Sequence, residues 1–313
     1  MGRIVCEDVP VPSVAAGEIL VRTVYASICG SDLHGVFLGA PPEPGPPGYP
    51  GHESVGEVVE SRCSGFEPGD YVLTVPYAID GRSLAEFQAL PGAACIPLPA
   101  TVPLSHLLMA QQLGTVIYAL RCRPLDIVGK EAAIIGQGSA GAFFTFMLKR
   151  AGAARVLVSD KSPARLAYSA KLGADLTVDA NVADFRSVVM EATGGQGASL
   201  VVEAVGARET FPLSVELAAP GATLVWFGLP EGTADYPLSF STFFRRALTA
   251  YSNFGAQGEP GLESFRYAVR LIADGAIDVT PLLTHMLPIE EVGEAFHIAH
   301  DRSDNALKVS IKF

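Results

Sequence analysis

The stretch EAAIIGQGSAGAFFTFMLKRAGAARVLVSD, residues 131–160, decides the fold of the central part of this chain. It reads as a short buried strand, a glycine loop, an apolar helix and a second strand that ends in an aspartate. The loop has the spacing G-x-G-x-x-G, which alone is weak evidence because glycine is common in this sequence. Strand, loop, helix and acid in this order form the pattern of a dinucleotide-binding βαβ unit.

Each position of the loop has a separate predicted role. Gly136 permits the tight turn, Gly138 lets the backbone approach a pyrophosphate, and Gly141 allows the helix to pack closely on the strand. The pyrophosphate would rest on the N-terminus of the helix, at Ser139 and Ala140.

Asp160 ends the second strand nineteen residues after the last glycine of the loop. Its carboxylate is expected to accept hydrogen bonds from the adenosine ribose of the dinucleotide. Because its negative charge would repel a 2′-phosphate, the sequence favours NAD over NADP. The alternative is a glycine-rich turn followed by a solvated aspartate.

The same rhythm of strand and helix continues after residue 160. The segment SPARLAYSAKLG, residues 162–173, has a helix N-cap in Ser162, proline at the first helical position and Gly173 just past the end. Strand–helix alternation with short loops predicts an α/β protein with a doubly wound parallel sheet. Residues 19–100 instead contain short alternating and β-branched runs, which predict a separate β-rich region.

Composition excludes several classes of partner and location. The formal charge of −11 argues against nucleic acid and against an anionic membrane surface. No apolar run is long enough for a transmembrane helix, and the first residues lack the apolar core of a secretory signal. The five cysteines are odd in number and widely spaced, so we expect no disulfide framework and a cytoplasmic location.

Two segments of the β-rich region carry groups that suit a metal ion. ICGSDLHGVF, residues 28–37, follows an alternating strand and places Cys29 at its end, while His52 and Glu53 stand together at the head of another strand. Thiolate, imidazole and carboxylate form a reasonable ligand set for zinc with one open position. Taken singly, each residue has a plainer interpretation, such as a small buried cysteine or a loop histidine.

Four separated motifs, CGSDLH, PGHE, GFEPGDYV and GQGSAG, occur in one order along the chain. In this combination the chain resembles the medium-chain zinc-dependent alcohol and polyol dehydrogenases of the sorbitol and threonine dehydrogenase type. The resemblance implies a GroES-like β domain that holds a catalytic zinc and a Rossmann domain that holds NAD. We place the GroES-like catalytic domain at residues 1–112 and 254–313, and the Rossmann domain at residues 113–253.

The resemblance also assigns the zinc ligands. Cys29 and His52 match two ligand positions, and Asp32 would orient His52. The third position in many relatives corresponds here to Gln111, whose neutral amide is a poor zinc ligand. Relatives of the sorbitol type use the glutamate after the histidine instead, so we assign Glu53 and leave Gln111 as the alternative.

Two further features are implied by the resemblance. The segment TVPYAIDGRSLAEF, residues 74–87, lacks the cysteine-rich lobe that binds a structural zinc in relatives, so we expect one catalytic zinc and no structural zinc. Ser31 would contact the substrate oxygen and His34 would pass the departing proton on. The plain alternative for both residues is ordinary loop polarity.

Other cofactor contacts carry over by position. Thr115 would lie near the nicotinamide, Arg165 on the adenosine ribose, and Phe227 and Leu229 would offer backbone groups to the carboxamide. Lys308 matches a basic position that faces the cofactor phosphates. An exposed strand lysine is its alternative interpretation.

The resemblance implies hydride transfer between NAD and a polar secondary alcohol or ketone, such as a polyol, sugar, cyclitol or amino alcohol. Homodimers or homotetramers are expected. Three alternatives remain open: a zinc-free NAD(P)-dependent reductase of the same superfamily, a non-catalytic NAD-binding relative, and an enzyme such as an epimerase that recycles its NAD internally.

Overall fold

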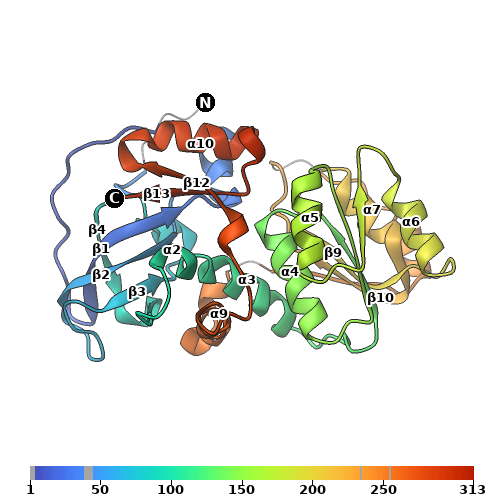
Figure 1. Cartoon of the computed structure of the whole chain (residues 1–313), viewed down its shortest axis with the longest axis horizontal. Helices are drawn as coiled ribbons and strands as arrows, with labels where there is room; N and C mark the ends of the chain where they lie inside the picture. The colour runs from blue at the N-terminus through green and yellow to red at the C-terminus, as the bar shows by residue number, and fades with distance from the viewer. Residues whose placement is uncertain (1–3, 39–44, 233–234, 254) are drawn as a thin grey trace. The chain divides into compact units, whose positions relative to one another are not determined.

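The protein is described by a computed structural model in which residues 4–38, 45–232, 235–253 and 255–313 are placed. The chain forms two compact units (Figure 1). Unit 1 comprises Met1–Thr115 together with Gly255–Phe313, and unit 2 comprises Val116–Phe254. Among the described residues, no helix combines the length and the apolar character needed to cross a bilayer.

Unit 1 is built on a seven-stranded sheet in the order β12-β13-β1-β2-β3-β5, with β4 also paired to β1. Its pairs are antiparallel except for the parallel pair of β12 and β13. The sheet strands are β1 (Glu18–Ser27), β2 (Glu53–Ser61), β3 (Tyr71–Thr74), β4 (Phe87–Pro91), β5 (Cys95–Pro97), β12 (Leu283–Pro288) and β13 (Lys308–Lys312). Its main helices are α1 (Gly30–Leu33), α2 (Leu104–Leu107), α9 (Glu263–Ala273) and α10 (Val292–Asp301), and α3 (Ala110–Arg121) begins in unit 1 and continues into unit 2.

The alternation of β1 explains how unit 1 folds. Ile19 and Val21 are fully buried in one apolar cluster, whereas the side chain of Arg22 is exposed. Alternate side chains of a strand point to opposite faces, so Ile19 and Val21 face one apolar cluster, while Leu20 on the other face is buried as well. The carboxyl end of β1 pairs with both β2 and β13, and Ser27 lies opposite Glu53 in one pair and Ser310 in the other.

Unit 2 is a six-stranded parallel sheet in the order β11-β10-β9-β6-β7-β8. Helices α4 and α5 contact one another, as do α6 and α7, and the two pairs cover opposite faces of the sheet (Figure 1). The predicted doubly wound parallel sheet is therefore confirmed. The elements are β6 (Glu131–Ile135), α4 (Ser139–Arg150), β7 (Arg155–Asp160), α5 (Pro163–Lys171), β8 (Leu176–Asp179), α6 (Phe185–Ala192), β9 (Ala198–Glu203), α7 (Thr210–Leu217), β10 (Ala218–Trp226), α8 (Phe240–Arg245) and β11 (Thr249–Ser252).

Local signals set the ends of the helices in unit 2. The side chain of Ser162 caps α5 by accepting the N–H of Arg165, Pro163 occupies the first turn, and Gly173 follows the helix with a φ of +104°. This is the punctuation predicted from the sequence. Asp184 caps α6 in the same way through the N–H groups of the first turn.

Candidate metal and cofactor sites

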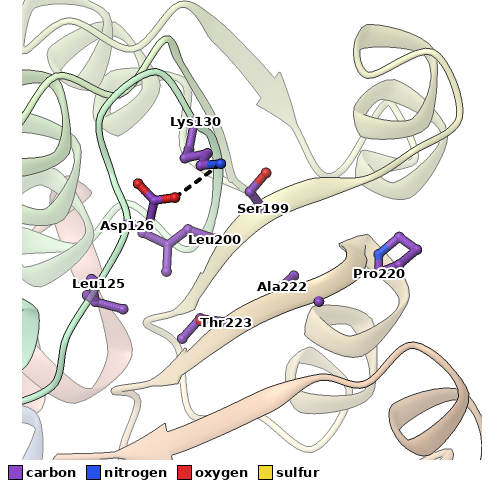
Figure 2. Close-up of a pocket in the computed structure, with 9 residues that line it drawn as sticks. Leu125, Asp126, Lys130, Ser199, Leu200, Pro220, Ala222 and Thr223 are labelled. Carbon is purple, nitrogen blue, oxygen red and sulfur yellow. Dashed lines mark ion pairs between the residues drawn. The ribbon is translucent and has the colours of Figure 1, made fainter.

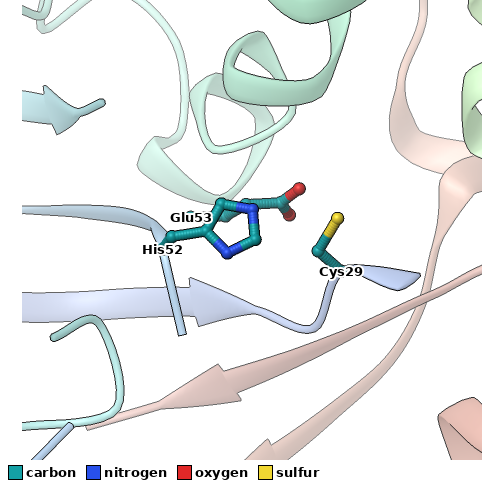
Figure 3. Close-up of side chains that lie close together, drawn as sticks. All are labelled: Cys29, His52 and Glu53. Carbon is teal, nitrogen blue, oxygen red and sulfur yellow. The ribbon is translucent and has the colours of Figure 1, made fainter. Parts of the chain in front are cut away.

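The metal candidates come from the ends of two adjacent strands in unit 1. Cys29 follows β1 and precedes α1, while His52 and Glu53 stand where the antiparallel strand β2 begins. Because antiparallel neighbours bring one strand's end beside the other's start, the three side chains meet. Figure 3 shows thiol, imidazole and carboxylate turned toward one another, and their ligand atoms all lie within 4.8 Å of each other.

This group fits a zinc ion in both chemistry and size. Thiolate sulfur, imidazole nitrogen and carboxylate oxygen are the donors that zinc accepts, at about 2.0–2.3 Å, which separates tetrahedral ligand atoms by roughly 3.3–3.8 Å. A spread within 4.8 Å can therefore close around one ion by small side-chain rotations. Gln111, the alternative third ligand, is buried in the first turn of α3.

Asp32 holds two of the three candidates in place. Its Oδ1 lies 3.0 Å from Nδ1 of His52, and its Oδ2 accepts the main-chain N–H of Cys29 at 2.8 Å. Binding the imidazole through Nδ1 leaves Nε2 for a metal. Burial lowers the pKa of His52, but the Asp32 carboxylate and then Cys29 outweigh it and hold that pKa well above its ordinary value. This contact is the one expected if Asp32 orients His52 for a metal, and that role stays a prediction.

Glu53 has a partner that sequence reasoning missed. Nζ of Lys308, from β13, lies 2.5 Å from Oε2 of Glu53, and the hydroxyl of Ser27 donates to the same oxygen. Both charged side chains are almost fully buried. Burial opposes ionisation of each, yet their mutual attraction lowers the pKa of Glu53 and raises that of Lys308. Oε1 is the carboxylate oxygen left for a cation.

The position of Lys308 corrects one expectation. The alternative of an exposed strand lysine is wrong, since Lys308 is 3% exposed. Its ammonium pairs with Glu53, and the contact expected between Lys308 and the cofactor phosphates stays a prediction. The physical reason for its burial is its strand, which lies between β12 and β1 and is buried along most of its length.

Ser31 and His34 lie close to the metal group along the chain. Ser31 is in α1 and His34 begins a π-helical turn over His34–Leu38, and both are half-buried. Their roles toward substrate and proton stay predictions.

The glycine loop of unit 2 has the geometry expected of it. Gly136 has a φ of +90°, and its N–H donates to the carbonyl of Ser159 at 2.8 Å. A Cβ at Gly141 would lie 2.0 Å from the carbonyl oxygen of Gly136, so only glycine allows α4 to pack this closely. Around Gly138, the residue before Ser139 at the start of α4, a Cβ would meet nothing within 4 Å. The turn and packing roles are confirmed, and the pyrophosphate contact stays a prediction.

Asp160 lies at the carboxyl end of β7 beside this loop. Its Oδ2 accepts the N–H of Gln137 at 2.7 Å, and its Oδ1 accepts the N–H of Ser162 at 2.8 Å. One guanidinium nitrogen of Arg165 is 4.0 Å from Oδ2. The structure therefore brings together Asp160 and Arg165, the two residues predicted to contact the adenosine ribose.

Gln137 is a buried connector that the sequence did not reveal, because the second position of the motif accepts any residue. Its Nε2 donates to the carbonyl of Gly136 at 2.8 Å. Its Oε1 accepts the hydroxyls of Thr145, on α4, and Ser169, on α5, at 2.9 and 2.6 Å. One amide thus ties the loop to both helices of that face.

Phe227 and Leu229 follow β10 at the same carboxyl edge of the sheet as the glycine loop. The N–H of Phe227 donates to the carbonyl of Glu203 at 2.9 Å. Thr115, on α3, donates its hydroxyl to the carbonyl of Gln111 at 3.2 Å. Their contacts with a nicotinamide stay predictions.

A small hollow lies at the opposite edge of the unit 2 sheet. It has a volume of about 180 Å³, and Lys130 and Ser199 line it where β6 and β9 begin (Figure 2). Asp126 forms an ion pair with Lys130 at 3.1 Å. Parallel α/β sheets bind ligands at the carboxyl ends of their strands. This hollow therefore takes no part in the cofactor site.

Comparison with known proteins defines the class. The family model "Alcohol dehydrogenase GroES-like domain" matches residues 15–100, and "Zinc-binding dehydrogenase" matches residues 140–274. Together they cover more than half of the chain. The chain belongs to the medium-chain zinc-dependent alcohol dehydrogenase family, whose members are oxidoreductases acting on CH–OH groups. Membership implies zinc and a nicotinamide cofactor.

Particular relatives agree with this class. An L-threonine 3-dehydrogenase of Bacillus velezensis is 29% identical, over 93% of this chain and 91% of the relative. An alcohol dehydrogenase of Cupriavidus necator is 26% identical over 99% and 96%. Among solved structures, an alcohol dehydrogenase from Thermus sp. ATN1 is 25% identical, with a TM-score of 0.84 over 99% of this chain and 96% of that chain.

Proposed function

We propose that this protein transfers hydride between NAD and a polar secondary alcohol or its ketone, in a reaction that depends on one zinc ion. Polyols, sugars, cyclitols and amino alcohols are the substrate classes proposed. The observation that carries the proposal is the convergence of Cys29, His52 and Glu53 within 4.8 Å. Membership of the zinc-dependent alcohol dehydrogenase family supports it.

The side chains of unit 1 would hold the metal and manage protons around it. Zinc, when bound, supplies Lewis-acid polarisation of an alcohol or carbonyl oxygen. Asp32 keeps His52 presented through Nε2, and Lys308 balances the charge of Glu53. Ser31 would contact the substrate hydroxyl, and His34 would carry its proton toward solvent.

The carboxyl edge of unit 2 would hold the cofactor. The N-terminus of α4, at Ser139 and Ala140, suits the pyrophosphate, because main-chain N–H groups there have no partner within the helix. Asp160, with Arg165 beside it, would bind the adenosine ribose and disfavour NADP. Thr115 and the main chain after β10 would meet the nicotinamide.

Finer parts of the proposal concern metal count, assembly and location. We propose no structural zinc, because the sequence passes from Val75 to Phe87 without a cysteine. We further propose a homodimer or homotetramer in the cytoplasm. Five free cysteines support a reducing compartment.

The direct test incubates the protein with a panel of secondary alcohols and either NAD or NADP. The absorbance of the reduced cofactor is measured before and after a chelator removes the metal. We expect activity with NAD that chelation removes and zinc restores. Cys29→Ser should lose both zinc and activity, whereas Cys122→Ser, which changes an equally half-buried cysteine, should keep them.

Other outcomes would favour the alternatives. Activity that survives chelation would support a zinc-free reductase. Tightly held NAD without net NADH would instead support an epimerase-like or non-catalytic protein.

A further inference from the structure

Glu203 is a buried acid in unit 2 that neither the metal group nor the glycine loop explains. It is the last residue of β9 and has no exposed surface. Its strand lies between β6 and β10, where Glu203 is opposite Ile135 on one side and Trp226 on the other. Glu203 therefore stands at the carboxyl edge of the sheet, in register with the residues that precede the glycine loop and Phe227.

This one residue holds two loops through both its side chain and its main chain. Oε1 accepts the N–H groups of Val205 and Gly206, each at 2.9 Å. The main-chain carbonyl of Glu203 accepts the N–H groups of Phe227 and Gly228, at 2.9 and 3.0 Å. The loop after β9 and the loop after β10 are thus anchored at the same residue.

The two loops also touch backbone to backbone. A Cβ at Gly206 would lie 2.1 Å from the carbonyl oxygen of Leu229, and a Cβ at Gly228 would lie 2.2 Å from the nitrogen of Gly206. There is no space for a side chain at either position. A displacement of Gly206, which the carboxyl of Glu203 holds, would therefore displace Leu229.

Burying an acid at this position costs folding free energy. In the part of the chain that the structure describes, Oε2 of Glu203 forms no well-aligned hydrogen bond, although it lies against Gly228. Burial raises the pKa of Glu203, although the N–H of Gly206, the Thr210 hydroxyl and other nearby donors lower it. A buried carboxyl whose hydrogen bonds are incomplete destabilises the fold, so its presence at this position favours a further role.

We propose that Glu203 is a positioning residue for the nicotinamide end of the cofactor. Its carboxyl fixes Gly206, and Gly206 in turn fixes the main chain of Leu229, which with Phe227 is proposed to meet the carboxamide. This inference rests on the proposed function, because it concerns how the same site aligns its cofactor. The same carboxyl accepts the N–H of Val205, which packs against Gly136, so the inference requires a smaller effect on the glycine loop than on Leu229.

Two ligands allow the nicotinamide end of the cofactor to be tested separately from its adenosine and pyrophosphate end. NADH carries the nicotinamide, and ADP-ribose has the same adenosine and pyrophosphate without it. With Glu203→Ala we expect the Kd of NADH, measured by calorimetry, to rise about tenfold, as when a ligand-ordering contact is lost. The Kd of ADP-ribose should stay within about twofold of the unmodified protein.

Two variants serve as controls. Glu203→Gln keeps an oxygen acceptor for both N–H groups, so it should restore NADH binding to within about threefold. Glu209→Ala removes an exposed acid at the start of α7 and should leave both Kd values unchanged. If Glu203→Ala does not fold, Glu203→Asp takes its place, because the shorter side chain cannot reach the same N–H groups.

The outcomes distinguish this inference from the proposed function. Equal weakening of NADH and ADP-ribose, or no change in either, would overturn the positioning role while leaving a nucleotide-binding enzyme. Failure of the unmodified protein to bind NADH would overturn the proposed function and the inference together.

Discussion

Asp32 acts on two of the proposed zinc ligands at once, since one carboxylate binds the ring of His52 and the main chain of Cys29. Loss of such a supporting hydrogen bond typically costs about 10–100-fold in metal affinity. We therefore expect Asp32→Ala to weaken zinc binding by that amount, measured by competition with a chromophoric chelator. Asp80→Ala, at an exposed acid of the same unit, is the control, and equal affinities for the two variants would contradict the role.

The raised pKa of His52 predicts that zinc binding depends on pH. Burial lowers that pKa, but the opposite effect of Asp32 and Cys29 is larger, so the net pKa is raised. Near neutral pH the imidazole therefore holds its proton more tightly than an ordinary histidine does. Zinc requires the neutral ring and must displace this proton. Zinc affinity should thus rise with pH throughout the range below the raised pKa and then cease to depend on His52. Titrations across this range measure it, and a flat profile would refute it.

The charge of Asp160 predicts cofactor choice. Asp160→Asn keeps an acceptor for the N–H of Ser162 but removes the charge that would repel a 2′-phosphate. The ratio of kcat/KM for NADP to that for NAD should rise by about tenfold or more. Asp126→Asn, at an exposed acid on the opposite edge of the sheet, should leave the ratio unchanged.

At the residue scale, the sequence predicted the site residues that belong to recognisable motifs, but not the contacts that form between elements distant in the chain. Cys29, His52 and Glu53 were predicted as a metal group, and the structure brings them together. The buried partner of Glu53 was not foreseen, because an ion pair between distant strands leaves no local pattern. Gln137 was missed for the same reason, since its hydroxyl partners come from two helices.

At the scale of elements, two glycines at the junction of β6 and α4 have different roles: Gly141 allows close packing, and Gly138 is proposed to leave room for the cofactor. Gly141→Ala would push a Cβ to within 2.0 Å of the carbonyl oxygen of Gly136, and overpacking of this kind costs about 1–3 kcal/mol. We expect urea unfolding to show a loss in that range. Gly138→Ala meets open space, so it should leave the free energy of unfolding unchanged while weakening NADH binding. Equal stability losses in both variants would contradict this division.

The strands and helices of unit 2 could be predicted from the sequence because each has a characteristic hydrophobic period and residues that mark its ends. Ser162 and Gly173 mark the limits of one helix in the sequence itself. The burial of β13 was not readable, because it depends on flanking strands β12 and β1 that pair with it from elsewhere in the chain. Local alternation cannot reveal whether a strand is central or at an edge.

At the scale of the whole molecule, the two units should respond to different ligands. Each has its own buried apolar cluster, and a ligand stabilises the part that binds it. Calorimetry should therefore show one transition that chelation lowers and another that NADH raises. In Cys29→Ser the chelator shift should vanish and the NADH shift remain. A single transition that both treatments move alike would argue against separate units.

The discontinuous course of unit 1 was predictable only from family resemblance. Residues 255–313 return to the first sheet after the whole of unit 2, and nothing in their own composition indicates which sheet they join. Local patterns predict elements, whereas the pairing of β13 with β1 is a long-range property.

That return has a consequence for biosynthesis. The ammonium that neutralises Glu53 lies on β13, which a ribosome makes only after all of unit 2. A nascent chain, or one truncated before this strand, holds the cysteine and histidine but an uncompensated acid. The group of side chains proposed to bind zinc therefore gains its full set of neighbours only when the last strand has been made and has paired with β1.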